Sequence, residues 1–276
     1  MKILITGASG YIGRHIINQF INTEHKIIVN DFSNPGIKCD NIEYNGKNLF
    51  ESENPYEETG RPDVCIHLAW KDGFIHNSNA HMEYLSDHYK FIDKMLSAGL
   101  KQIVIMGSMH EVGYFEGAID ENTPCNPLSM YGIAKDSLRR SSKLLAEKYN
   151  AVWQWIRAYY IYGDDKRGNS IFAKIQQAVE NGKTTFPFTT GKNKYDFIHI
   201  DTLANMIAAV ALQKEVDGII NCCSGKPVSL SEQVEKYIKD NNLNISLEYG
   251  AFPDRPYDSP AVWGDDSKIK KILNNK

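Results

Sequence analysis

The sequence lacks the features of a secreted or membrane-spanning protein. Its five cysteines are odd in number and none stands in a C-x-x-C pair, so they suit neither a disulfide framework nor a zinc site. No window reaches the roughly 18 consecutive apolar residues of a membrane span. The opening segment MKILITGASGYIG has neither the long apolar stretch nor the cleavage site of a secretory signal. We therefore expect a cytoplasmic protein with no metal centre and no membrane contact.

Basic residues are not in excess either. The 31 Lys and Arg face 34 Asp and Glu, for a net charge of −3, whereas a nucleic-acid-binding protein needs a basic face. We therefore expect no nucleic-acid partner. With 42% hydrophobic and 24% charged residues the composition is that of a soluble globular protein. A length of 276 residues fits one large α/β domain with a small satellite.

Strand-like and helix-like segments alternate through the first two thirds of the chain. This order predicts βαβ units, and hence a Rossmann-type, doubly wound parallel sheet in an α/β fold. The predicted dinucleotide-binding domain is 1–163 with 195–225, and 164–194 with 226–276, richer in breakers, form a small C-terminal substrate-binding cap. The expected strands are 2–5, 26–30, 64–69, 102–106 and 153–158, with a weak one at 42–44, and the expected helices include 11–21, 81–96, 131–148 and 171–180.

A glycine pattern follows the first expected strand and opens the first expected helix. Gly7, Gly10 and Gly13 give G-x-x-G-x-x-G, with Tyr11 and Ile12 between the last two glycines. A turn without Cβ atoms lets the backbone approach a pyrophosphate, whose charge is stabilised at the helix N-terminus. The pattern predicts a dinucleotide-binding loop, and the alternative is a strand-to-helix turn that binds nothing.

Asp31 ends the second expected strand, 18 positions after Gly13. A carboxylate at this place accepts hydrogen bonds from the hydroxyls of the adenosine ribose and repels a 2′-phosphate. No arginine follows at once to receive such a phosphate. Asp31 therefore favours NAD(H) over NADP(H), unless it is a solvated turn residue.

Tyr131 and Lys135 stand at i and i+4 of an expected helix and so share one of its faces. A neighbouring ammonium stabilises a phenolate, so we expect Lys135 to lower the pKa of Tyr131 from about 10 and prepare it for proton transfer. The spacing alone also occurs in surface pairs, and its position after a dinucleotide loop is what makes it specific.

Together these segments resemble the extended short-chain dehydrogenase/reductase family, in its NAD-dependent epimerase/dehydratase group. The resemblance covers essentially the whole chain and rests on TGASGYIG, HLAW, GSMHEV, YGIAK, RAYYIYG, YDFIHIDTLA, GKPVSLSEQVE and DRPYD. It implies that Tyr131 exchanges a proton with a sugar oxygen while Lys135 holds the nicotinamide ribose. The cofactor-binding residues it implies are Gly7, Gly10, Tyr11, Ile12, Gly13, Asp31, Leu68, Ala69, Tyr131 and Lys135.

The sequence departs from the family pattern after the strand 102–106. The position of the usual catalytic Ser or Thr falls on Met109 or a neighbour, so we assign that role to Ser108, the hydroxyl available there. The resemblance also implies that dehydratases need an Asp-Glu pair at the place where this chain has His110 and Glu111. Dehydration is therefore disfavoured. His110 is either an alternative acid or a structural or substrate-binding residue.

The expected substrate region also differs from the family. Tyr160 replaces the usual Asn and Tyr195 the usual Arg, and these aromatics either stack on a base or fill the core. Arg255 resembles the Arg that grips the nucleotide diphosphate, with an ordinary surface Arg as the alternative. The candidate substrate-binding residues are His110, Glu111, Tyr160, Tyr195 and Arg255.

The stretch from 107 to 135 resembles the members of this family that reduce 4-keto-6-deoxyhexose nucleotides to deoxytalose nucleotides. It implies an NAD(P)-dependent reductase acting at C4 of such a nucleotide sugar. One alternative is a 4-epimerase that keeps its NAD. A second is a non-catalytic dinucleotide-binding regulator, although those regulators lose the Tyr/Lys pair. The family resemblance further implies a homodimer built through the helices at 81–96 and 131–148.

Overall fold

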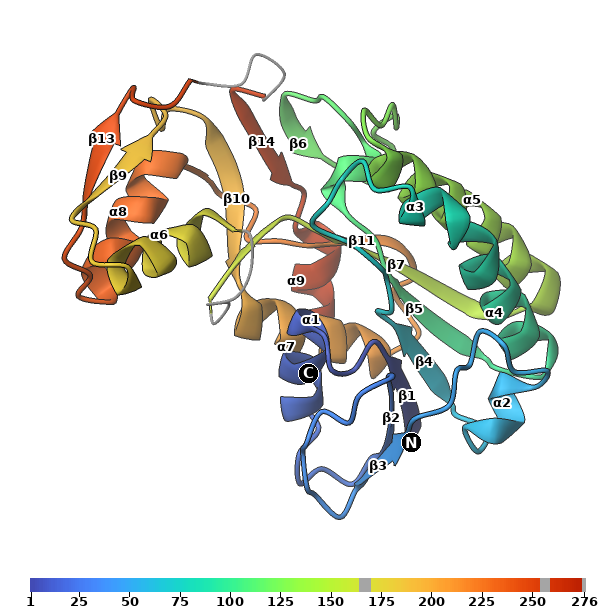
Figure 1. Ribbon diagram of the computed structural model, residues 1–276. Helices are drawn as coiled ribbons and strands as arrows, with labels where there is room; N and C mark the ends of the chain where they lie inside the picture. The colour runs from blue at the N-terminus through green and yellow to red at the C-terminus, as the bar shows by residue number, and fades with distance from the viewer. Residues whose placement is uncertain (164–169, 254–258, 275–276) are drawn as a thin grey trace.

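The computed structural model describes residues 1–163, 170–253 and 259–274, and its centre is a seven-stranded, wholly parallel sheet (Figure 1). The strand order is β11-β7-β5-β4-β1-β2-β3, which is the doubly wound order in which the chain reverses beside the first strand. The predicted Rossmann-type sheet is confirmed. Its strands are β1 (Lys2–Thr6), β2 (Lys26–Asn30), β3 (Ile42–Asn45), β4 (Val64–His67), β5 (Gln102–Met106), β7 (Val152–Ala158) and β11 (Gly218–Cys222).

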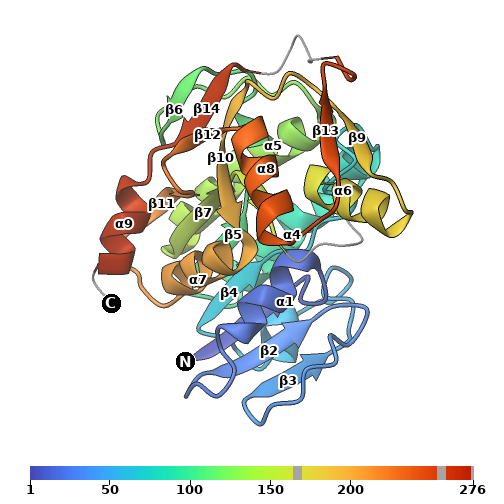
Figure 2. The ribbon, with the colours of Figure 1, turned by 90° about the vertical axis from the view of Figure 1, so that its left-hand side faces the viewer.

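Helices cover both faces of this sheet (Figures 1 and 2). Because both faces are buried, the central strands are continuous apolar runs rather than alternating ones, as in β1, which reads KILIT. One core cluster packs α1, α7 and α9 on the sheet, and another packs α4 and α5 on the opposite face. The helices are α1 (Tyr11–Asn18), α2 (Pro55–Glu58), α3 (Ala80–Glu83), α4 (Leu85–Ser97), α5 (Met130–Tyr149), α7 (Ile200–Ala211) and α9 (Ser267–Asn274).

A second layer of structure lies beside the carboxyl ends of the central strands (Figure 1). It contains a sheet in the order β12-β10-β14-β6, with β8 also paired to β10, and a two-stranded sheet β13-β9. A separate apolar cluster forms its core. Its elements are β6 (Gly117–Ile119), β8 (Tyr160–Tyr162), α6 (Ile171–Glu180), β9 (Thr185–Phe188), β10 (Lys194–His199), β12 (Pro227–Ser229), α8 (Leu230–Asp240), β13 (Ser246–Tyr249) and β14 (Ala261–Gly264).

The second sheet takes strands from both of the segments that the sequence analysis separated. β6, β8 and most of β10 fall in the ranges 1–163 and 195–225, yet none of the three belongs to the seven-stranded sheet. All three strands contribute to the separate apolar cluster instead, with Ile119 from β6, Tyr160 from β8, and Tyr195 and Phe197 from β10. The linear boundaries therefore do not coincide with the sheets.

Two expected helices have different bounds. The helix expected at 11–21 ends at Asn18, where the chain tightens into i→i+3 hydrogen bonds from Gln19 to Ile16 and from Phe20 to Ile17. The helix expected at 81–96 is divided at Tyr84, which closes α3 and opens α4. Within the described residues, no helix is both long and apolar enough to cross a membrane.

Candidate active site

The glycine loop between β1 and α1 has room for backbone only. Gly7 has φ +67°, and a Cβ on it would lie 2.6 Å from the backbone nitrogen of Ala69. A Cβ on Gly13 would lie 2.4 Å from the carbonyl oxygen of Gly7. Gly10 provides no side-chain cap for α1, so the N–H groups of its first turn keep their attraction for an anion. The loop thus fits a dinucleotide pyrophosphate.

Residues at the ends of the neighbouring strands β2 and β4 lie beside this glycine loop. Asp31, directly after β2, accepts hydrogen bonds from the backbone N–H of Ser9 at 2.9 Å and of Phe32 at 2.7 Å. Leu68 and Ala69 follow β4, and the N–H of Ala69 donates to Oγ1 of Thr6 at 3.4 Å. The carboxylate therefore lies beside the glycine loop, at the edge where an adenosine ribose would bind.

Tyr131 lies in the first turn of α5, facing the end of β5. Ser129 caps this helix by accepting from the N–H of Gly132 at 3.1 Å, and the Tyr131 N–H donates to the carbonyl of His76 at 2.9 Å. The phenol makes a hydrogen bond with Ser108. Ser108 thus lies beside the tyrosine, and its role as the catalytic hydroxyl stays a prediction. Burial raises the pKa of Tyr131 to about 12, and the Ser108 hydrogen bond opposes the rise.

Lys135 lies one helical turn further on and does not act on Tyr131 as expected. Its Nζ donates to the carbonyl of Met106 at 2.7 Å and lies 5.8 Å from the centre of the Tyr131 ring. Burial lowers the pKa of Lys135 to about 7. The expectation that the ammonium lowers the pKa of Tyr131 is therefore wrong for the chain alone, because burial is the largest influence on the phenol and raises its pKa.

His110 lies against the same tyrosine. The His110 and His76 ring centres are 4.4 Å apart, and the His76 ring stacks on Tyr131 at 5.5 Å. Burial, together with His76, lowers the pKa of His110 to about 4. At neutral pH His110 is an uncharged hydrogen-bonding group, and it carries no ready proton.

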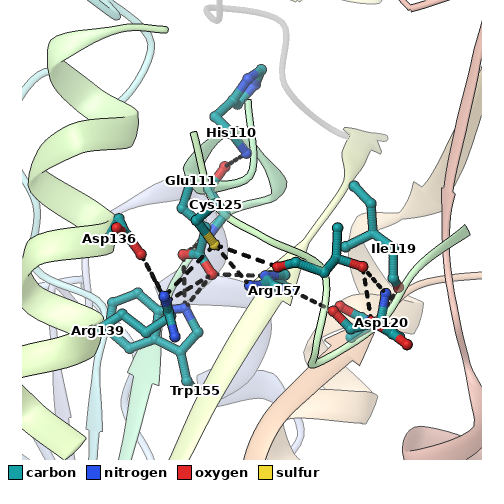
Figure 3. A network of polar contacts seen from close by, with 12 residues as sticks. His110, Glu111, Ile119, Asp120, Cys125, Asp136, Arg139, Trp155 and Arg157 are labelled. Carbon is teal, nitrogen blue, oxygen red and sulfur yellow. Dashed lines mark hydrogen bonds and ion pairs between the residues drawn. The ribbon is translucent and has the colours of Figure 1, made fainter. Parts of the chain in front are cut away.

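Glu111 does not face a substrate, contrary to its assignment as a substrate-binding residue. It is fully buried and accepts from Nε of Arg157 at 2.7 Å and from Nε1 of Trp155 at 2.8 Å (Figure 3). Burial raises its pKa, and the attraction of Arg157 opposes the rise. Arg139 adds a further cation, 3.7 Å from the carboxylate. The carboxylate of Glu111 also accepts from the backbone N–H of Ser108 at 3.5 Å. Glu111 therefore supports the turn Met109–Glu111 from the interior of the protein.

The aromatic substitutions of the expected substrate region pack on each other. The ring centres of Tyr160 and Tyr195 are 4.3 Å apart, and Phe197 lies 6.0 Å from Tyr195. Tyr195 is buried in the core of the second layer, which agrees with the core-filling alternative and argues against direct substrate binding. Tyr160 is half-buried. Arg255 lies outside the described residues.

Four residues of this site were missed by the sequence reasoning. Trp70 follows β4, and its indole lies over the ammonium of Lys135, 3.6 Å from the ring centre. His81 and His88 flank this indole, and His76 stacks on Tyr131. Trp70 stands in the HLAW segment, so the signal available was a bulky aromatic directly after Leu68 and Ala69, the pair expected to line the cofactor.

Comparison with known proteins identifies the family. The model of the NAD dependent epimerase/dehydratase family matches residues 3–223, and the chain belongs to this family of enzymes. The chain is 42% identical over 269 residues to a dTDP-6-deoxy-L-talose 4-dehydrogenase (NAD(+)) of Aggregatibacter actinomycetemcomitans, with 96% of this chain and 99% of the relative covered.

More distant relatives share the fold with other chemistry. A putative UDP-glucose 4-epimerase of Methanocaldococcus jannaschii is 28% identical, with 83% of this chain and 79% of the relative covered. The crystal structure of a dTDP-glucose 4,6-dehydratase from Streptomyces venezuelae, with NAD bound, superposes with a TM-score of 0.84 at 17% identity. That match covers 100% of this chain and 92% of the other.

The buried Glu111 predicts a large effect on stability. Glu111→Gln leaves Arg157 without a counter-charge in the interior, so we expect the free energy of unfolding to fall by about 3–5 kcal/mol. Urea unfolding followed by circular dichroism measures this. Glu43→Gln is the control, because it breaks an exposed ion pair with Lys26 and should cost no more than about 1 kcal/mol. Equal, small losses in both variants would contradict the role given to Glu111.

Proposed function

We propose that the chain is an NAD-dependent oxidoreductase that interconverts the C4 hydroxyl and C4 ketone of a nucleotide-activated 6-deoxyhexose, such as dTDP-6-deoxy-L-talose. The observation that carries this proposal is the 42% identity to the 4-dehydrogenase over 96% of the chain. The close grouping of Ser108, Tyr131 and Lys135 at the carboxyl end of the central sheet supports it.

The residues divide the chemistry among them. The nicotinamide dinucleotide, when bound, supplies or accepts the hydride at C4. In the reducing direction Tyr131 donates its proton to the C4 oxygen, and Ser108 hydrogen-bonds the same oxygen and orients it. Lys135 binds the nicotinamide ribose through its ammonium. The pKa of Tyr131, at about 12 in the chain alone, leaves the phenol protonated at neutral pH, as a proton donor must be.

Among the described residues of this site, no pair of groups suits dehydration. It needs an acid for the departing hydroxyl and a base for the neighbouring carbon. The low pKa of His110 leaves it uncharged, and Glu111 is engaged with Arg157 and Trp155 in the interior. Reduction requires only a hydride and one proton donor.

A 4-epimerase is the second candidate, because it would use the same three residues. The 28% identity to the putative UDP-glucose 4-epimerase is the observation in its favour. An epimerase returns the hydride to the sugar and consumes no cofactor, whereas the proposed enzyme oxidises one NADH for each ketone reduced. A non-catalytic regulator is disfavoured by the intact Tyr131 and Lys135.

We further propose that the second layer binds the nucleotide part of the substrate. A reducing compartment such as the cytoplasm suits the free thiols of all five cysteines.

We also propose a homodimer through α4 and α5, which expose Tyr89, Ile133 and Leu144. Ile133 and Leu144 lie eleven positions apart, about three turns, and so share one face of α5.

The first prediction of the proposed function concerns proton transfer. Tyr131→Phe removes the acidic hydroxyl and keeps the ring, so we expect kcat to fall by about 10²–10⁴ while the Kd for NADH changes little. Absorbance of NADH during turnover of a dTDP-4-keto-6-deoxyhexose measures kcat, and protein fluorescence measures Kd. Near-normal turnover would contradict the assignment. Ser108→Ala should cost less, and a larger loss in His110→Ala would make His110 the third catalytic residue.

The second prediction concerns the cofactor. NADH should bind more tightly than NADPH, and Asp31→Ala should narrow the difference because the carboxylate no longer repels the 2′-phosphate. Titration calorimetry with both cofactors measures the two Kd values. Asp40→Ala is the control, because it also removes a carboxylate but Asp40 does not stand at the end of β2. Tighter binding of NADPH by the wild-type protein would overturn this preference.

The third prediction concerns assembly. Leu144 is 66% exposed on α5, and Leu144→Arg places a charge in the proposed interface, so we expect the dimer to dissociate. Light scattering after size-exclusion chromatography gives the mass. Leu212→Arg is the control, because Leu212 follows α7 on the opposite face of the sheet and is 38% exposed. A monomeric wild-type protein, or equal dissociation in both variants, would rule out this interface.

A further inference from the structure

The ammonium of Lys135 rests on the face of an indole. Its Nζ lies 3.6 Å from the centre of the Trp70 ring and donates to the carbonyl of Met106 at 2.7 Å. Lys135 is only 3% exposed, so little water solvates its charge. A cation over an aromatic face is attracted by the ring quadrupole, and the attraction is greater where water is excluded.

Trp70 is itself fixed from two sides. Its Nε1–H donates to Nδ1 of His81 at 3.0 Å, and Nε2 of His81 lies 2.9 Å from the carbonyl of Ile75. Because an indole nitrogen only donates, His81 accepts at Nδ1 and carries its proton on Nε2. The ring of His88 stacks on the indole with centres 4.5 Å apart and an angle of 16°. These contacts leave the indole one orientation, which presents its face to Lys135.

His88, whose ring stacks on the indole, is linked to the central sheet by a series of hydrogen bonds. Nδ1 of His88 lies 2.9 Å from Nε2 of His67, and Nδ1 of His67 lies 2.8 Å from Oγ1 of Thr6. Burial lowers the pKa of His67 to about 3 and that of His88 well below its ordinary value. Both rings are therefore uncharged at neutral pH and add no positive charge beside Lys135.

We propose that Trp70 is a positioning residue, whose indole keeps the Lys135 ammonium charged and in place for the nicotinamide ribose. The assignment rests on the cofactor role of Lys135 in the proposed function. It explains why a bulky aromatic follows the cofactor-lining Leu68 and Ala69, and why His81 and His88 hold it. Trp70 acts through Lys135 and need not touch the reacting atoms.

The charges around Lys135 show why such support is needed. Burial lowers its pKa to about 7, and the distant attraction of Glu111 opposes this. His67 and His88 face it from β4 and α4, and both are neutral. Tyr131, on its own helix, presents its ring at 5.8 Å. The two groups in direct contact with the ammonium that favour its charge are the Met106 carbonyl and the Trp70 indole.

The test measures the titration of Lys135 in the cofactor-free protein. Lysines labelled with ¹³C at Cε are followed by NMR, and the Lys135 signal is the one absent from Lys135→Met. In the wild type it should titrate near 7. Trp70→Leu removes the ring face, so the midpoint should fall by about one pH unit, and Trp70→Phe should retain part of the effect.

A matched variant separates this effect from lost packing. Trp153 is also a buried tryptophan, and its Nε1 donates to Oγ of Ser142 at 3.0 Å, away from Lys135. Trp153→Leu should destabilise the protein and leave the Lys135 midpoint unchanged. An unchanged midpoint in folded Trp70→Phe and Trp70→Leu would overturn the proposal. If Trp70→Leu does not fold, the midpoint in Trp70→Phe decides.

Binding of NADH gives a second, independent measurement. At about pH 7 Lys135 is about half protonated in the wild type and about one-tenth protonated in Trp70→Leu, so NADH should bind several-fold more weakly to the variant there. At about pH 5 the lysine is protonated in both proteins, and the difference in Kd should disappear. A loss that is equal at both pH values would show a steric role for Trp70 and contradict the proposal. Because neither measurement uses a sugar substrate, a failure of the proposed reaction would leave the titration result standing.

Discussion

The buried ion pair between Glu111 and Arg157 is the constraint on which the rest of the site depends. Arg157 is part of β7, between β11 and β5 in the central sheet, whereas Glu111 ends the turn that follows β5. A charge pair in the interior is tolerated only if both partners are fully hydrogen-bonded. Here the Trp155 indole and the Ser108 N–H donate to Glu111, and Arg157 donates to the backbone carbonyl of Asp120. The ion pair therefore fixes the turn that carries Ser108 and His110 relative to the sheet.

The positions of the candidate catalytic groups follow from this ion pair in order. Ser108 follows the end of β5, and the first turn of α5 places Tyr131 beside it. Lys135 then extends into the interior between Met106 and Trp70. The glycine loop and Asp31 stand at the same carboxyl edge of the sheet, beyond β4. In a doubly wound sheet this edge is where ligands bind, and the second layer lies over it (Figure 1).

Much of this arrangement could be predicted because it is local in the chain. The glycine spacing, the carboxylate at the end of β2 and the i, i+4 pair of Tyr131 and Lys135 each depend on a few consecutive residues. The burial of Glu111 and the indole over Lys135 could not be predicted. Both come from contacts between strands and helices far apart in the sequence, as does the passage of β10 into the second sheet. The pKa of Tyr131 was misjudged for the same reason, since burial is a property of the whole fold.

The most direct test of the account follows the hydride itself. NADH carrying deuterium at C4 of the nicotinamide, on either face in separate samples, is supplied with a dTDP-4-keto-6-deoxyhexose, and the product is analysed by NMR. We expect deuterium from one face only at C4 of the sugar, with one NAD⁺ formed for each sugar reduced. Interconversion of C4 epimers of a UDP-sugar, with no deuterium entering the sugar and no net oxidation of NADH, would contradict the account and establish the epimerase.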